Sequence, residues 1–283
     1  MLHVTRGDEV RLQDDVARSE VVIVPARGAI VTHFRVAGRE LLYLDEATLA
    51  DSTKNVRGGI PLLFPSPGKL EGDRFTRGAA GGAMKQHGFA RELPWAVRDT
   101  GTNDAAFATV ALDANARTLA AYPWEFAAQI TFSLRAAVLR LDIVVENRGA
   151  EAMPFAFGTH PYFLVRDKAA ARIATRATRA FDNVTKKVGP FSGFDLTASE
   201  VDLHLLDHGS SSSELTWGDG SALAIRASSE FGRWVVWTLA GKDFVCLEPW
   251  TAPGNALNTG ESLLTLPPGG SHPLWIEMEY RAS

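Results

Sequence analysis

The most promising candidate for chemistry in this sequence is His160, near the end of the apolar stretch at residues 155–163. Pro161 follows it and favours extended backbone at the preceding residue. Side chains alternate between the two faces of a strand, so Ala156, Gly158 and His160 would share one face. Two small side chains beside an imidazole predict a floor on which a ligand could lie close to the backbone. The alternative is a histidine that only closes a strand and binds its neighbours.

A second candidate is Glu248, which lies near the end of the apolar stretch at residues 244–250. Burial raises the pKa of a carboxyl group unless a hydrogen-bond donor offsets it, and a raised pKa suits proton transfer near neutral pH. A buried glutamate bound only by backbone amides is the alternative. Trp250 would share the face of Glu248 and could form an apolar wall or a stacking platform for a sugar ring, or simply pack in the core.

Two arginines and a histidine lie beside glycines. Arg57 precedes Gly58-Gly59, and His87 and Arg91 flank the segment Gly88-Phe89-Ala90. Arginines in such places can reach a phosphate or a sugar hydroxyl, and two of them could clamp an anion. Solvation at the surface is the alternative for each arginine. The short alternating segment at residues 200–205 places Asp202 and His204 on one face.

Composition and motifs exclude several classes of function. The chain has 283 residues, of which 46% are hydrophobic and 22% charged, and its net charge of −4 argues against nucleic acid as the main partner. The single cysteine, Cys246, excludes an intramolecular disulfide and a cysteine-rich metal site, and the seven scattered histidines predict no metal site. Phosphate-loop, dinucleotide-binding, zinc-protease and nucleophile-elbow motifs are absent.

The lengths of the apolar stretches predict where the protein is located. No run approaches the roughly 18 consecutive apolar residues of a membrane helix, and residues 1–19 contain no apolar core of a secretory signal. We therefore expect a cytoplasmic protein that does not enter the membrane.

Apolar residues recur with a period of two along most of the chain. The clearest cases are residues 130–134, 139–145 and 274–280, and shorter runs between residues 20 and 44 predict hairpins. We expect a short helical turn at 45–49, a long loop at 66–86, and a solvated basic loop at 166–187. The pattern predicts an all-β protein with few short helices, folded as one large antiparallel sandwich domain over residues 1–283.

Four motifs in order resemble the aldose 1-epimerase (mutarotase) family, over about residues 20–282. They are Arg57-Gly58-Gly59-Ile60-Pro61, Gln86-His87-Gly88-Phe89-Ala90-Arg91, His160-Pro161-Tyr162-Phe163 and Glu248-Pro249-Trp250. The branch that the chain most resembles contains the glucose-6-phosphate 1-epimerases. The resemblance implies a galactose mutarotase-like β-supersandwich and interconversion of the α and β anomers of an aldohexose or hexose 6-phosphate.

The resemblance also implies roles for individual residues. His160 matches the general acid, Glu248 the general base and Asp202 a substrate-binding aspartate. Arg57, His87 and Arg91 match residues that line the sugar site, with the arginines contacting a 6-phosphate in the phosphate-accepting branch. The reaction needs only proton transfer and orientation, so no cofactor or metal is implied.

Two other classes of function fit the same residues. A non-catalytic carbohydrate-binding protein would keep Trp250 but would not need both His160 and Glu248. A glycosidase or a polysaccharide lyase is the other reading, and a glycosidase would need a carboxyl pair, which Asp202 and Glu248 could supply. We expect the ligand to be a small sugar or sugar phosphate, and the protein to be a monomer or a homodimer.

Overall fold

The alternating segments form antiparallel ladders, as their period of two predicts. The computed structural model describes residues 1–283. Three larger sheets contain most of the strands, and all pairings between these strands are antiparallel. No helix of this fold combines the length and the apolar character that crossing a lipid bilayer requires.

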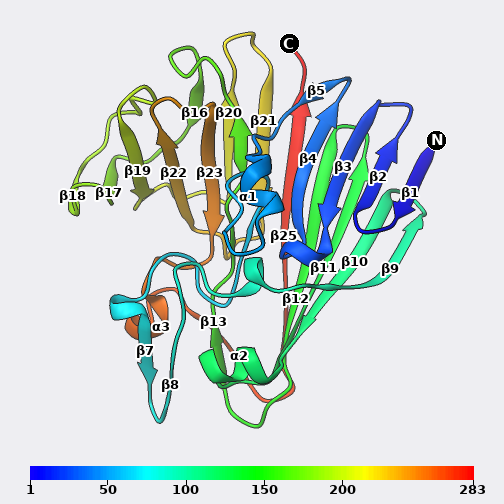
Figure 1. Ribbon diagram of the computed structural model, residues 1–283. Helices are drawn as coiled ribbons and strands as arrows, with labels where there is room; N and C mark the ends of the chain where they lie inside the picture. The colour runs from blue at the N-terminus through cyan, green and yellow to red at the C-terminus, as the bar shows by residue number, and fades with distance from the viewer.

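The N-terminal sheet has five strands in sequence order. They are β1 (Leu2–Arg6), β2 (Val10–Asp14), β3 (Ser19–Val24), β4 (Ile30–Val36) and β5 (Arg39–Glu40). The hairpins expected between residues 20 and 44 are confirmed, because β3 pairs with β4 and β4 pairs with β5. Strand β2 contacts β10 and β11 of the next sheet, which lies beside the N-terminal sheet in Figure 1.

The central sheet contains the longest strands. In spatial order they are β16 (Arg172–Ala174), β20 (Ser212–Thr216), β21 (Ala222–Ala227), β25 (Ser271–Arg281), β12 (Val138–Asn147), β11 (Phe126–Arg135), β10 (Ala106–Asp113) and β9 (Ala96–Thr102). Burial alternates residue by residue through β12, as predicted.

The third sheet, which we call the cavity sheet, stands at the left of Figure 1. In spatial order it contains β18 (Lys187–Pro190), β17 (Arg179–Asp182), β19 (Glu200–Leu205), β22 (Arg233–Leu239), β23 (Phe244–Trp250), β14 (Gly158–Thr159) and β6 (Leu62–Leu63), with β15 (Tyr162–Leu164) also paired to β23. One face of this sheet belongs to the core: a cluster of 62 buried residues includes Val245 and Leu247 of β23 together with Ile276 and Met278 of the central sheet.

The remaining elements are short. Two small ladders join β13 (Met153–Phe155) to β24 (Leu264–Leu266) and β7 (Arg74–Arg77) to β8 (Ala80–Ala83). The helices are α1 (Glu46–Ala50), α2 (Ala116–Ala121) and α3 (Ala256–Thr259), with 3-10 turns η1 (Pro25–Arg27), η2 (Glu71–Asp73) and η3 (Ala90–Glu92). Helix α1 confirms the expected helical turn, and Asp45 caps it by accepting a hydrogen bond from the Thr48 amide.

Three local expectations need correction. The apolar stretch at 155–163 is not one strand, because it is divided among the end of β13, β14 and the start of β15. The expected long loop at 66–86 contains the β7–β8 hairpin, which projects at the bottom of Figure 1. The basic segment at 166–187 contains β16 and β17 rather than loop alone, since Ile173, Ala180 and Phe181 are buried or half-buried and pair with neighbouring strands.

Candidate functional site

Strand register brings the candidate residues onto one face of the cavity sheet. Glu248 lies opposite Val235 of β22, and Trp237, two residues further on, lies opposite Asp202 of β19. Paired residues project to the same face, and so do residues two apart on one strand. Asp202 and Glu248 therefore share a face although 46 positions separate them in the sequence.

This face forms the wall of a cavity of about 930 Å³, which is within the range of roughly 300–1,000 Å³ of small-ligand sites. All seven residues singled out in the sequence line it: Arg57, His87, Arg91, His160, Asp202, Glu248 and Trp250. Residues that act on one sugar molecule must lie close together, and the fold meets this requirement for all seven.

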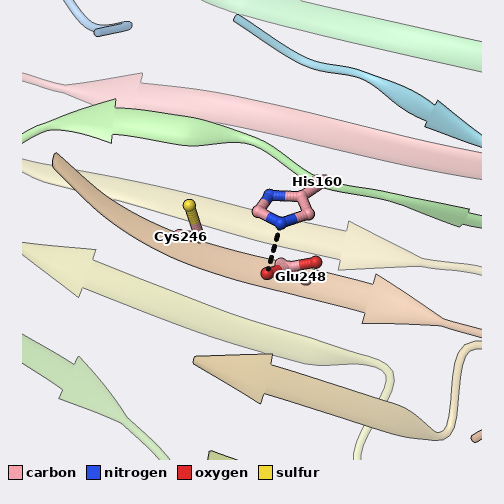
Figure 2. A group of neighbouring side chains, drawn as sticks. All are labelled: His160, Cys246 and Glu248. Atoms are coloured by element: carbon pink, nitrogen blue, oxygen red, sulfur yellow. Dashed lines mark ion pairs between the residues drawn. The ribbon is translucent and has the colours of Figure 1, made fainter. Parts of the chain in front are cut away.

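The imidazole of His160 contacts the carboxylate of Glu248. Nε2 lies 3.3 Å from Oε1, and both side chains are largely shielded from solvent, at 10% and 1% exposure. Figure 2 shows the imidazole lying over β23 with its nitrogen directed at the carboxylate. Because both residues also line the cavity, a bound molecule can reach the two groups together.

Burial determines how this pair carries protons. Burial raises the pKa of Glu248 well above its usual value, and the nearby Asp202 carboxylate raises it further. Burial likewise lowers the pKa of His160 to about 3, aided by the positive charge of Arg91. Burial therefore favours a neutral imidazole beside a protonated carboxyl group, rather than the permanently charged imidazolium that a general acid suggests.

Trp250 has a more specific position than a stacking platform. Its Nε1–H donates a hydrogen bond of 3.1 Å to Oε2 of Glu248, so that Glu248 is held on one side by an indole and on the other by an imidazole. This bond favours the ionised carboxylate and so partly opposes the effect of burial on the pKa.

The predicted open floor beside His160 is wrong. A Cβ atom on Gly158 would lie 2.7 Å from Cδ1 of Trp250, so the indole fills the space left by the missing side chain. Ala156 is buried against Ala252 and Ala256 and does not line the cavity. The small residues make room for protein side chains and not for a ligand.

His87 lines the cavity, with Nε2 of its ring 3.2 Å from the side-chain amide nitrogen of Gln86. Its backbone is left-handed, with φ of 73°, and the Gly68 amide donates a 3.0 Å hydrogen bond to Nδ1. Since Nδ1 accepts, the neutral ring carries its proton on Nε2. Burial and the charge of Arg91 lower the pKa of His87 well below its usual value, which keeps the ring neutral.

Neither Arg57 nor Arg91 forms an ion pair with a carboxylate. Arg91 donates from its NH2 group to the backbone oxygen of Gln86 at 2.9 Å, and its Nε is buried without a hydrogen-bond partner. The Arg57 side chain makes no hydrogen bond or ion pair with the protein, although its backbone amide binds Thr48. By contrast Arg233, which also lines the cavity, is paired to Glu261 at 2.6 Å. Arg57 and Arg91 remain available to an anion.

Asp202 is held in place by a segment that the sequence did not indicate. Asn183 donates a 2.6 Å hydrogen bond to Oδ2 of Asp202 and accepts one of 2.6 Å from Lys186. The opposite charges on either side fix which end of the Asn183 amide faces Asp202. His204 lies 3.5 Å from the other carboxylate oxygen and packs edge-on against Trp250.

Sequence reasoning missed several residues of this cavity. Asn183 and Lys186 fall in the segment that we expected to be a solvated loop, yet both line the cavity. Tyr162 stacks on His160 with 4.7 Å between ring centres, and Cys246 lies beside the pair (Figure 2). The only available signal was spacing, since Tyr162 is two residues after His160 and Cys246 two before Glu248.

Comparisons with known proteins identify the family of this chain. The family model described as aldose 1-epimerase matches residues 8–279. The chain is 30% identical over 164 residues to a protein of Cenchrus ciliaris provisionally described as a glucose-6-phosphate 1-epimerase, covering 53% of this chain and 45% of that one. A Salmonella typhimurium protein with the same provisional description is 28% identical over 160 residues, covering 56% and 50% respectively. The chain spans about half the length of these curated relatives.

Solved structures share the fold over nearly the whole chain. The Slr1438 protein from Synechocystis sp. PCC 6803 is 35% identical, with a TM-score of 0.95 and coverage of 99% of this chain and 98% of that one. The galactose 1-epimerase of Lactobacillus acidophilus NCFM, 13% identical, has a TM-score of 0.75 with 99% of both chains covered, which shows the fold alone. The all-β galactose mutarotase-like fold is therefore confirmed, and the chain belongs to the aldose 1-epimerase family.

Proposed function

We propose that this protein interconverts the α and β anomers of an aldohexose or a hexose 6-phosphate by acid/base-catalysed opening of the sugar ring. The contact between His160 and Glu248 at the cavity wall carries the proposal. It places two proton-exchanging groups side by side at a site that a small ligand can reach.

The pair suits a reaction that moves one proton out and one in. Ring opening requires a base to take the proton of the C1 hydroxyl and an acid to protonate the ring oxygen. In our proposal the pair's proton moves through the 3.3 Å contact to His160 when sugar binds. His160 gives it to O5 while Glu248 takes the C1 hydroxyl proton, and the ring opens to the aldehyde.

Reclosure reverses these transfers after rotation about the C1–C2 bond. The O5 hydroxyl attacks the opposite face of the aldehyde carbon and gives its proton to His160. Glu248 gives a proton to the aldehyde oxygen, which becomes the C1 hydroxyl of the other anomer. The pair holds one proton before and after each half-reaction, so its net charge never changes in the buried site. Burial, which disfavours a net charge, is therefore compatible with every step.

The remaining predicted residues would bind and orient the sugar. His87 and its neighbour Gln86 line the cavity as polar groups that a sugar hydroxyl could bind, and Asp202 offers a fixed acceptor. Arg57 and Arg91, free of carboxylate partners, support a 6-phosphate as part of the substrate, because unpaired guanidinium groups bind phosphate strongly.

The test is an anomer-exchange assay by NMR with glucose, galactose and glucose 6-phosphate. We expect Glu248→Gln to lower the exchange rate at least about a hundredfold. Glu230→Gln is the matched control, because Glu230 pairs with His272 at 3.0 Å away from the cavity. An unchanged rate in folded Glu248→Gln protein would remove the assignment of Glu248.

The same assay decides the substrate. If the phosphate is bound as proposed, the Arg57→Ala, Arg91→Ala double variant loses activity on glucose 6-phosphate, whereas Arg117→Ala, on an exposed pair with Glu92, does not. If the protein acts on free sugars and the double variant retains that activity, the epimerase proposal stands but the proposal that the substrate carries a phosphate does not. Binding without exchange would favour a sugar-binding protein, and cleavage of a disaccharide would favour a glycosidase.

A further inference from the structure

Three chemically different metal ligands meet at the wall of the cavity. One donor atom each from His160, Cys246 and Glu248 lies within 4.8 Å of the other two, and all three residues are buried. Cys246 and Glu248 project from the same face of β23, and His160 precedes β15, which pairs with β23 (Figure 2).

The spacing of these donors is close to that of a tetrahedral metal site. Zinc-to-ligand bonds of about 2.0–2.3 Å place neighbouring ligand atoms about 3.3–3.6 Å apart. Nε2 of His160 and Oε1 of Glu248 are already 3.3 Å apart. The sulfur of Cys246 lies within 4.8 Å of the other two donor atoms, so it would need to move by about 1 Å to reach tetrahedral spacing. A change of side-chain rotamer can supply this movement.

The thiol of Cys246 plays no part in the proposed proton transfers. Its residue has 0% exposure, and its sulfur makes no hydrogen bond, packing instead with Tyr162 and Phe244. A thiolate, an imidazole and a carboxylate form a ligand set that suits Zn²⁺ and not the oxygen-seeking Mg²⁺ or Ca²⁺.

We propose that His160, Cys246 and Glu248 together bind Zn²⁺, and that bound Zn²⁺ inhibits the protein. As the ion binds, the Cys246 thiol and the His160–Glu248 pair each release one proton to the solvent. The ion takes the lone pairs of His160 and Glu248 that proton transfer requires, and its fourth position faces the cavity. The inhibition rests on the proposed function, but the binding does not.

Binding is tested on chelator-treated full-length protein with Co²⁺ as a spectroscopic probe. We expect an intense thiolate-to-cobalt charge-transfer band in the wild type and no such band in Cys246→Ser. Zn²⁺ affinity, measured by competition with a chromophoric chelator, should fall at least about tenfold in Cys246→Ser. His272→Gln, which disrupts the His272–Glu230 pair, should leave the affinity unchanged.

Two results would overturn the site: no thiolate band in the wild type, or equal Zn²⁺ affinity in the wild type and Cys246→Ser. The first does not depend on any variant folding. Inhibition is tested by anomer exchange, where half-maximal inhibition should need at least about tenfold more Zn²⁺ in Cys246→Ser than in the wild type. Exchange that persists at saturating Zn²⁺ refutes the inhibition, whereas metal binding by a protein without exchange activity refutes the proposed function alone.

Discussion

Gly158 lies directly opposite Trp250 in the cavity sheet, and the indole of Trp250 occupies the space that a side chain on Gly158 would need. From this position the indole donates its hydrogen bond to Glu248. A glycine that seemed to leave room for a ligand instead sets the position of a residue that holds the candidate base.

Replacing Gly158 by alanine should disturb both stability and activity. The added Cβ would lie 2.7 Å from the indole and 3.1 Å from Pro67, so Trp250 must shift. We expect a loss of about 1–3 kcal/mol in the free energy of unfolding, measured by urea denaturation, together with reduced exchange activity. Gly189→Ala is the control, because a Cβ at that strand glycine meets nothing within 4 Å. Equal stability of the two variants would contradict this account.

Trp250→Phe should change the pH dependence of the reaction. The variant keeps an aromatic ring but loses the N–H that favours ionised Glu248, so the pKa of Glu248 should rise further. We expect about a tenfold loss of rate and a shift of the Glu248-dependent limb of the pH–rate profile to higher pH. Trp217→Phe, which removes an indole bond to the backbone of Leu164 outside the cavity, should leave the profile in place.

Asn183→Ala should weaken sugar binding more than catalysis. Without its amide, the Asp202 carboxylate loses the 2.6 Å bond that fixes it and becomes free to rotate. We expect KM to rise about tenfold with a smaller change in kcat, as measured by steady-state exchange kinetics. Lys187→Ala changes the same hairpin outside the cavity and should have no effect. A fall in kcat alone would argue that Asp202 takes part in proton transfer.

The stability of the wild type relative to Glu248→Gln should depend on pH. Burial raises the pKa of Glu248 well above 4.5, so above about pH 4.5 the folded state keeps a proton that the unfolded chain releases. The unfolded state then binds fewer protons, and the free energy of unfolding falls as pH rises towards the raised native pKa. Urea titrations between about pH 4.5 and 8 should show the wild type losing stability relative to Glu248→Gln as pH rises. A constant difference would mean that Glu248 is ionised in the folded protein.

Strand periodicity was predictable from the sequence because each strand buries only one face. The alternation at 139–145 and 274–280 correctly predicted β12 and β25, and the shared face of Asp202 and His204 followed from their spacing. These inferences depend on neighbours along one strand, which a sequence displays directly.

Contacts between strands could not be predicted in the same way. The bond from Asn183 to Asp202 and the approach of Cys246 to His160 depend on which strands pair and in what register. The interpretation of Gly158 failed for this reason, since its small size was visible but its partner Trp250, 92 positions away, was not. Resemblance to a family supplied the grouping of His160 with Glu248 that periodicity alone left open.

The pairing of β22 with β23 also determines which changes of chain length the protein tolerates. Glu248 and Trp250 line the cavity together because they are two residues apart on β23, whereas Leu247 projects from the other face into the core. One residue inserted in the middle of β23 would turn every side chain beyond it to the opposite face. Evolution and protein engineering are therefore free to vary the length of the exposed turn at residues 241–243 between β22 and β23, but not the length of a strand that lines the cavity.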